Sequence, residues 1–247
     1  MYLRDVHKDL DLPSLHNFIR ENPLGVLTTA LKSPSYPLLQ NSHIPWVLDV
    51  PPTSDDAPKA ILRGHLARAN PQTKAILAAA EQQRSDKNVE SITLEEEVLL
   101  LFTSPIAHYI TPQFYTETKP TTGKTVPTWN YAAVQAYGSL TVHYGDEFLG
   151  KQIDDLTREC EEGVMGYKRE ESWTVDDAPE RYVGVLKKAI LGVEVRVQRL
   201  EGKWKMSQEL GEGDRRGVVG GLEGIGSLVG REVAGLVRER GKKKCPV

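Results

Sequence analysis

Cysteine is scarce in this chain of 247 residues, which contains only Cys160 and Cys245. Neither belongs to a Cys-x-x-Cys pair or to a cluster with metal-binding spacing, so the sequence predicts neither a disulfide framework nor a metal site. Long apolar runs are also missing, because the longest, Val98 to Phe102, is far shorter than the roughly 20 residues that cross a bilayer. No signal-peptide pattern opens the chain. We therefore expect a soluble, cytoplasmic protein without membrane contact.

Neither sign of charge dominates the composition. The chain has 31 basic and 34 acidic residues, a net charge of −3, and so offers no overall attraction to nucleic acid. The exception is the segment from Arg231 to Val247, where six basic residues face two acidic ones. No aromatic side chain interleaves its lysines for base stacking. A solvated end is therefore predicted there, and a nucleic-acid partner is not expected.

Several catalytic motifs are absent or incomplete. Gly123-Lys124-Thr125 resembles the end of a phosphate-binding P-loop, but Thr118 stands where that loop needs glycine. The glycine-rich segment from Gly211 to Asp214 does not follow a predicted strand, so it is not a dinucleotide-binding fingerprint. The hydrolase, zinc-protease and kinase motifs are missing. The sequence therefore assigns no catalytic residue.

Apolar spacing and capping signals predict four helices. Asp11 can cap a helix that ends before Asn22-Pro23, and Asn70-Pro71 opens a helix that runs to about Glu81. Residues 146–162 and 178–190 carry helical apolar spacing as well.

Six extended segments are predicted as strands, at residues 24–31, 37–50, 61–66, 98–103, 134–144 and 193–197. Pro45 interrupts the second segment, and Gly138 marks a bend or bulge in the fifth. The proline-rich stretch from Pro51 to Pro58 predicts an exposed hairpin loop, and residues 105–124 predict irregular structure. Because helices do not alternate regularly with the strands, an antiparallel barrel with peripheral helices fits better than a doubly wound parallel sheet.

The predicted domain division has its boundary near residue 222. Residues 1–222 form one barrel domain with helical additions, and residues 223–247 form a flexible, basic tail. Ten of the 21 glycines lie from Gly211 onward, where periodic apolarity is lost.

Aromatic, basic and amide residues concentrate at the ends of predicted strands, a mixture that suits a flat anionic ligand. Each residue also has a structural interpretation: the arginines can form surface ion pairs, Asn70 can cap its helix, and the tryptophans can belong to the core. The candidate ligand-binding residues are Asn41, Ser42, His43, Arg63, His65, Arg68, Asn70, Trp129, Asn130, Trp204 and Lys205.

The same segments resemble a known family. The motifs are Gly64-His65-Leu66-Ala67-Arg68-Ala69-Asn70-Pro71-Gln72, Val126-Pro127-Thr128-Trp129-Asn130-Tyr131 and Leu200-Glu201-Gly202-Lys203-Trp204-Lys205-Met206-Ser207-Gln208. Shorter ones, among them Tyr109-Ile110-Thr111-Pro112, extend the match over residues 1–222. The chain resembles the FMN-binding negative transcriptional regulators of the PaiB type, which belong to the FMN-binding split-barrel superfamily with the pyridoxamine phosphate oxidases.

The resemblance implies a six-stranded antiparallel, Greek-key-like split barrel. It also implies a homodimer with FMN and a small-molecule substrate in clefts at the subunit interface. Arg63 would reach the phosphate, Asn41, Ser42, His43 and His65 would line the ring or ribityl side, and Trp204 and Lys205 would close the site. The chain departs from the family at Thr116 to Thr122, which looks longer, and at Gln208-Glu209, where the family has Gln-Asn.

Three functions remain open at this stage. The first is a small FMN-dependent oxidoreductase. The second is a transcriptional regulator, which the missing helix-turn-helix pattern and the negative net charge disfavour. The third is a split barrel that binds heme or no cofactor, with His43, His65 or His108 as an axial ligand.

Overall fold

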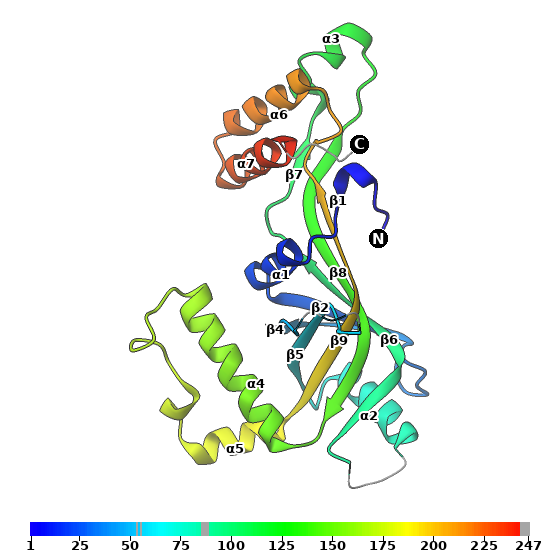
Figure 1. The fold of residues 1–247 in the computed structure, drawn as a ribbon, viewed down its shortest axis with the longest axis vertical. Helices are drawn as coiled ribbons and strands as arrows, with labels where there is room; N and C mark the ends of the chain where they lie inside the picture. Colours follow the sequence, from blue (N-terminus) through cyan, green and yellow to red (C-terminus); the bar gives the residue numbers. More distant parts are fainter. Residues whose placement is uncertain (53, 55, 85–88, 243–247) are drawn as a thin grey trace. The chain divides into compact units, whose positions relative to one another are not determined.

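The computed structural model describes residues 1–52, 54, 56–84 and 89–242 (Figure 1). Its strands are β1 (Lys8–Asp9), β2 (Leu24–Ala30), β3 (Leu39–Pro45), β4 (Val47–Asp49), β5 (Ala60–Ala67), β6 (Ser91–Thr103), β7 (His108–Ile110), β8 (Thr128–His143) and β9 (Ile190–Lys205). Its helices are α1 (Leu12–Glu21), α2 (Pro71–Gln83), α3 (Thr118–Thr122), α4 (Asp146–Arg158), α5 (Glu180–Lys188), α6 (Glu212–Gly224) and α7 (Leu228–Lys242). A π-helical turn, Glu159–Val164, follows α4.

The strands form one antiparallel sheet in the order β3-β2-β6-β8-β9-β5-β4, with β1 added to β9 and β7 added to β8. Within the described residues this order ends at β3 and β4, so the sheet is not closed. The prediction of a mainly antiparallel β fold with peripheral helices is confirmed. The six predicted strands correspond to β2, β3, β5, β6, β8 and β9. Strand β4 also lies within the segment predicted at residues 37–50, after the interruption at Pro45. The strands β1 and β7 have only two or three residues each, too few for an alternating pattern to show.

The chain divides into two compact units. The smaller unit comprises residues 1–15, 103–134 and 201–247, and the larger unit comprises residues 16–102 and 135–200. This division does not follow the predicted boundary near residue 222. The long strands β8 and β9 contribute residues to both units, and for this reason each unit is assembled from segments far apart in the sequence.

Aliphatic and aromatic side chains of the strands form the core of the larger unit. Leu27, Leu62, Leu100 and Phe102 are fully buried there. Gly138, predicted as a bend, is a point of close approach, because a Cβ atom at this position would lie 2.2 Å from the Arg196 carbonyl oxygen.

The predicted helix caps are confirmed. Asn70 accepts a hydrogen bond from the Gln72 backbone N–H at 2.9 Å, and Pro71 begins α2. Asp11 accepts one from the Ser14 N–H at 3.0 Å at the start of α1. The helix predicted over residues 146–162 is α4, whose regular part ends at Arg158.

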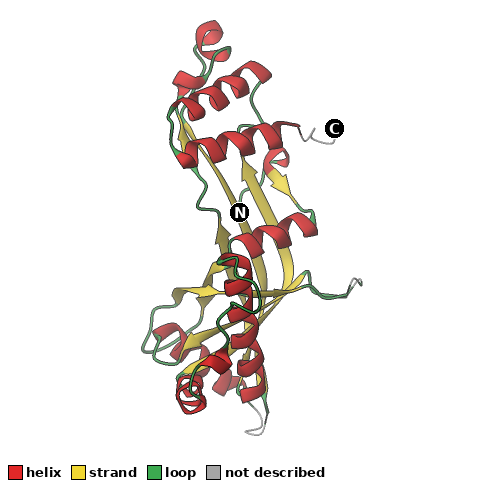
Figure 2. Ribbon diagram, turned by 90° about the vertical axis from the view of Figure 1, so that its left-hand side faces the viewer, coloured by secondary structure: helices red, strands yellow, loops and turns green. Residues whose placement is uncertain are grey.

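In the smaller unit, β7, β8, β9 and β1 lie side by side, and α6 and α7 cover one face of these strands (Figures 1 and 2). Strand alternation explains this packing: Ile110, Asn130, Trp204 and Met206 point to the covered face and are buried. The opposite face carries the residues between them.

The segment predicted as a flexible tail contains helix α7 as far as Lys242, so this prediction is corrected. Val233, Ala234 and Val237 of α7 are buried, as are Val218 and Leu222 of α6. Lys243, Lys244 and Cys245 lie outside the described residues.

The glycines that suggested flexibility instead permit close packing. Gly213, Gly217 and Gly221 recur every fourth residue and share one face of α6. A Cβ atom at Gly217 would lie 2.1 Å from the Phe114 carbonyl oxygen, and one at Gly221 would lie 2.2 Å from the Phe114 ring. Side chains at these positions would prevent the helix from packing against the chain at Phe114.

Among the described residues, no helix combines the length and the apolarity that a membrane crossing requires.

Candidate functional site

Arg63 lies on β5 and is only 5% exposed. Its Nε donates to Asp49 Oδ2 at 2.5 Å, and its Nη2 donates to Asp49 Oδ1 at 3.0 Å and to Asp155 Oδ2 at 2.8 Å. Nη1 makes no hydrogen bond within the described residues, but it too is buried. Two carboxylates therefore already neutralise this guanidinium group.

Asp155 of α4 is the centre of this ionic cluster. It also accepts hydrogen bonds from Lys151 and from Arg158 Nη2, the latter at 2.8 Å. Burial raises the pKa of Asp155, but the hydrogen bonds from Lys151, Arg63 and Arg158 outweigh burial and lower the pKa to about 2. A phosphate would have to displace these carboxylates to reach Arg63, so the geometry gives no support to the predicted phosphate contact.

The other candidates in the larger unit fall into two groups. Ser42, His65 and Asn70 form hydrogen bonds with other side chains of the protein. Asn70 Nδ2 donates to Ser42 Oγ at 2.9 Å, and His65 Nδ1 lies 2.8 Å from Gln152 Oε1. By contrast, Asn41 and His43 of β3 are exposed, and Arg68 is half-buried just after β5. Among the described residues of the larger unit, the Asn70–Ser42 hydrogen bond is the only one that joins two members of the predicted set.

Asn130 and Trp204 belong to the interior of the smaller unit. Asn130 is fully buried and its Nδ2 donates to Ser207 Oγ at 3.0 Å. Trp204 is 6% exposed beneath the guanidinium of Arg240, which lies 4.2 Å from the ring centroid. Arg240 also pairs with Asp9 at 2.8 Å. These contacts give both residues a packing role.

Trp129, in contrast, is 57% exposed on the face of the sheet opposite α6 and α7. Tyr109 is its direct partner across β7 and β8, with the two rings edge to face at 6.2 Å. Tyr131 follows Trp129 by two residues and therefore shares its face.

Two lysines extend this surface. Lys203 Nζ lies 5.4 Å from the Tyr131 ring centroid and 5.9 Å from that of Tyr2. Lys205 Nζ donates to Thr128 Oγ1 and, at 3.2 Å, to the Trp129 carbonyl oxygen. We call Tyr2, Tyr109, Trp129, Tyr131, Lys203 and Lys205 the aromatic–lysine face. Within the described residues, neither lysine forms an ion pair with a carboxylate.

Sequence reasoning found Trp129 and Lys205 but missed Tyr2, Tyr109, Tyr131 and Lys203. Strand alternation was the available signal for two of them, because Tyr131 follows Trp129 and Lys203 precedes Lys205 by two residues. The pairing of β7 with β8 places Tyr109, and contact with Lys203 places Tyr2. The sequence shows neither of these contacts.

Comparisons with known proteins agree with the resemblance seen in the motifs. Residues 1–199 match the model of a family described as "Putative FMN-binding domain". An uncharacterized protein of Aspergillus fumigatus, AFUA_5G13800, is 52% identical over 258 residues and 99% of both chains. The protease synthase and sporulation protein PAI 2 of Bacillus subtilis is 26% identical over 99% of this chain and 100% of its own.

Proposed function

Since the chain belongs to the family of FMN-binding domains that matches residues 1–199, we propose that it is an FMN-dependent oxidoreductase whose aromatic–lysine face contacts the cofactor. The observation that carries this proposal is the exposed Trp129 ring, paired with Tyr109 and lying on the same face as two lysines without carboxylate partners.

The aromatic–lysine face fits FMN in two respects. The isoalloxazine ring is flat and aromatic, and indole and phenol rings offer it stacking or edge contacts. The FMN phosphate is an anion, and Lys203 and Lys205 supply cations that can form charge-assisted hydrogen bonds. Arg63 fits the phosphate less well because Asp49 and Asp155 occupy it.

Bound FMN supplies the electron-transfer chemistry, and the protein supplies binding and orientation. On this proposal, Trp129 and Tyr131 hold the ring, while Lys203 and Lys205 hold the negative charge.

We also propose that the protein is a homodimer in which the second chain covers this face. Trp129, Tyr109 and Tyr2 together expose a large apolar surface, and exposed surfaces of this kind mark interaction sites. A second copy would convert an open sheet face into a cleft that buries the cofactor and a small-molecule substrate.

Cofactor titration of Trp129→Ala tests the site. FMN is added to cofactor-free protein while the visible flavin spectrum is followed. We expect Trp129→Ala to weaken FMN binding by about tenfold, corresponding to the roughly 1.4 kcal/mol that one aromatic contact contributes. Trp173→Ala is the matched control, because Trp173 is also exposed but belongs to the larger unit. Equal affinities of the two variants would refute the assignment of this face.

The oxidoreductase activity is tested with FMN-loaded protein and reduced nicotinamide. Oxidation of the nicotinamide above the rate of free FMN supports the proposal. Sequence-specific DNA binding at ~150 mM salt without such turnover would instead support a regulator. A heme spectrum in the purified protein would favour the third alternative.

A further inference from the structure

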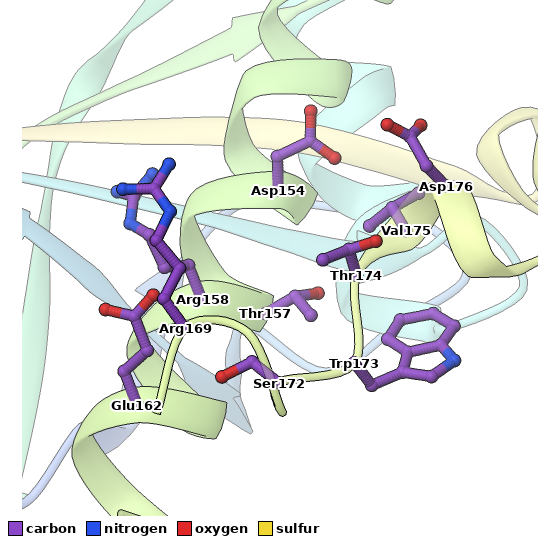
Figure 3. A pocket seen from close by; sticks show the side chains of 10 residues that line it. All are labelled: Asp154, Thr157, Arg158, Glu162, Arg169, Ser172, Trp173, Thr174, Val175 and Asp176. Atoms are coloured by element: carbon purple, nitrogen blue, oxygen red, sulfur yellow. The ribbon is translucent and has the colours of Figure 1, made fainter. Parts of the chain in front are cut away.

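A separate cavity of about 200 Å³ lies in the larger unit (Figure 3). Asp154, Thr157 and Arg158 of α4 line one side, Glu162 of the π-helical turn lies at the edge, and residues 169–176 form the other side. Short π-helical segments occur often at functional sites. None of the predicted FMN-contact residues lines this cavity.

One end of the cavity is cationic. Arg158 and Arg169 both line the cavity, and Figure 3 shows their guanidinium groups on the same side of it. Arg158 Nη2 donates to Asp155 Oδ1. Within the described residues, the other Arg158 nitrogens donate to no acceptor, and Arg169 forms no hydrogen bond or ion pair. The planar fork of a guanidinium group matches the geometry of a carboxylate. Glu162 is the acidic residue at this end.

The opposite end is anionic. Figure 3 shows the carboxylates of Asp154 and Asp176 together there, away from the two arginines. Within the described part of the chain, neither carboxylate accepts a hydrogen bond or forms an ion pair. An ammonium group is the natural partner for such a pair.

Hydroxyl groups and an indole also line the cavity. Ser172 Oγ donates to the Lys168 carbonyl oxygen, so its lone pairs can still accept a hydrogen bond. Trp173 is 48% exposed and gives the cavity an aromatic wall. The Trp173 backbone N–H donates to Glu161 Oε2 at 3.2 Å, and Thr174 forms a capping box with Asp177. These bonds hold the wall in place before a ligand arrives, which lowers the cost of binding.

We propose that this cavity binds a small zwitterion whose carboxylate and ammonium groups lie at opposite ends, such as an ω-amino acid or a dipeptide. The carboxylate contacts Arg158 and Arg169, and the ammonium group contacts Asp154 and Asp176. A cavity of about 200 Å³ has room for a small ligand of this kind.

Isothermal titration of the FMN-loaded protein tests the proposal with 6-aminohexanoate and glycylglycine as zwitterions. Hexanoate and hexylamine each carry only one of the two charges. We expect at least one zwitterion to bind, and both singly charged compounds to bind at least tenfold more weakly. No heat with either zwitterion, or equal binding of hexanoate or hexylamine, would overturn the proposal.

Variants then locate the site. Arg169→Gln and Asp176→Asn should each weaken zwitterion binding at least tenfold, since each removes one charge-assisted contact. Arg4→Gln, an exposed arginine of the smaller unit that does not line this cavity, should change the affinity less than twofold. Circular dichroism verifies that each variant is folded. Unchanged binding in both cavity variants would place the ligand elsewhere and contradict the proposal.

Discussion

Arg63 shows that a charged residue can form ion pairs inside the protein where the sequence suggests a ligand contact. The sequence marks it as a candidate phosphate ligand, yet in the structure it holds Asp49 and Asp155 together inside the larger unit. Removal of one partner from a buried ionic cluster leaves an uncompensated charge, which typically costs about 3–5 kcal/mol. Arg63 therefore contributes to the stability of the fold through this cluster.

We expect Arg63→Ala to lower the free energy of unfolding by about 3 kcal/mol, because Asp155 keeps Lys151 and Arg158 as partners. Urea denaturation followed by far-UV circular dichroism measures this change. Arg68→Ala is the control and should change the free energy by no more than about 0.5 kcal/mol. Similar losses in both variants would show that the cluster around Asp155 contributes little.

Asp155 predicts a specific loss of stability in acid. Its pKa is about 2 in the folded protein against 3.8 for the ordinary carboxyl group. The folded state therefore gains stability from the ionised carboxylate above about pH 4, and that gain, about 2 kcal/mol, disappears as the pH falls from 4 to 2. The unfolding free energies of the unmodified protein and of Asp155→Asn should accordingly converge over this range. Asp154→Asn, which changes an exposed neighbour, is the control. If the difference in unfolding free energy between the unmodified protein and Asp155→Asn stayed constant from pH 4 to pH 2, Asp155 would not be the origin of the acid sensitivity.

At the scale of single elements, α6 shows glycine acting through close packing. Gly217 has no room for a Cβ atom beside the Phe114 carbonyl oxygen, whereas a Cβ atom at Gly220 of the same helix would meet nothing within 4 Å. The same substitution should therefore have opposite effects at these two positions.

We expect Gly217→Ala to destabilise the protein by about 2 kcal/mol, a typical result of overpacking, because the backbone at Phe114 must shift. Gly220→Ala should stabilise it by about 0.5–1 kcal/mol, because alanine favours the helix and no contact is disturbed. Thermal unfolding of the two variants and of the unmodified chain measures whether each substitution raises or lowers the stability. If Gly217→Ala were as stable as Gly220→Ala, α6 would not pack closely against Phe114 at this position.

Most elements could be predicted from the sequence because their signals are local. The caps at Asp11 and Asn70 and the alternating valines near Val195 place α1, α2 and part of β9. Helix α7 could not be predicted, since its buried face depends on α6, and the glycines of α6 are typical of flexible chain as well. The ion pair between Arg63 and Asp155 could not be predicted either, because the two residues are 92 positions apart in the sequence.

At the scale of the whole molecule, the proposed homodimer makes a prediction about mass. Sedimentation equilibrium at micromolar concentration should give twice the chain mass of 27.5 kDa. Trp129→Lys should shift the protein to the monomer, because it introduces a charge into the centre of the proposed interface.

The exposed residues of α5 provide the matched control for this experiment. Tyr182, Val185 and Leu186 form another exposed apolar group. Tyr182→Lys should leave the dimer intact if the aromatic–lysine face is the interface. Dissociation of Tyr182→Lys but not of Trp129→Lys would move the interface to α5, and a monomeric unmodified protein would exclude the dimer.

The four tryptophans are divided evenly between the two units, and each unit contains one buried and one exposed indole. The smaller unit has Trp204 inside and Trp129 outside, and the larger unit has Trp46 inside and Trp173 outside. Indole fluorescence shifts to longer wavelength when water reaches the ring. A chain that keeps only Trp46 would therefore report the melting of one unit, and a chain that keeps only Trp204 would report the other. Coincidence of the two emission curves along a denaturant series would mean that the units unfold as one cooperative body.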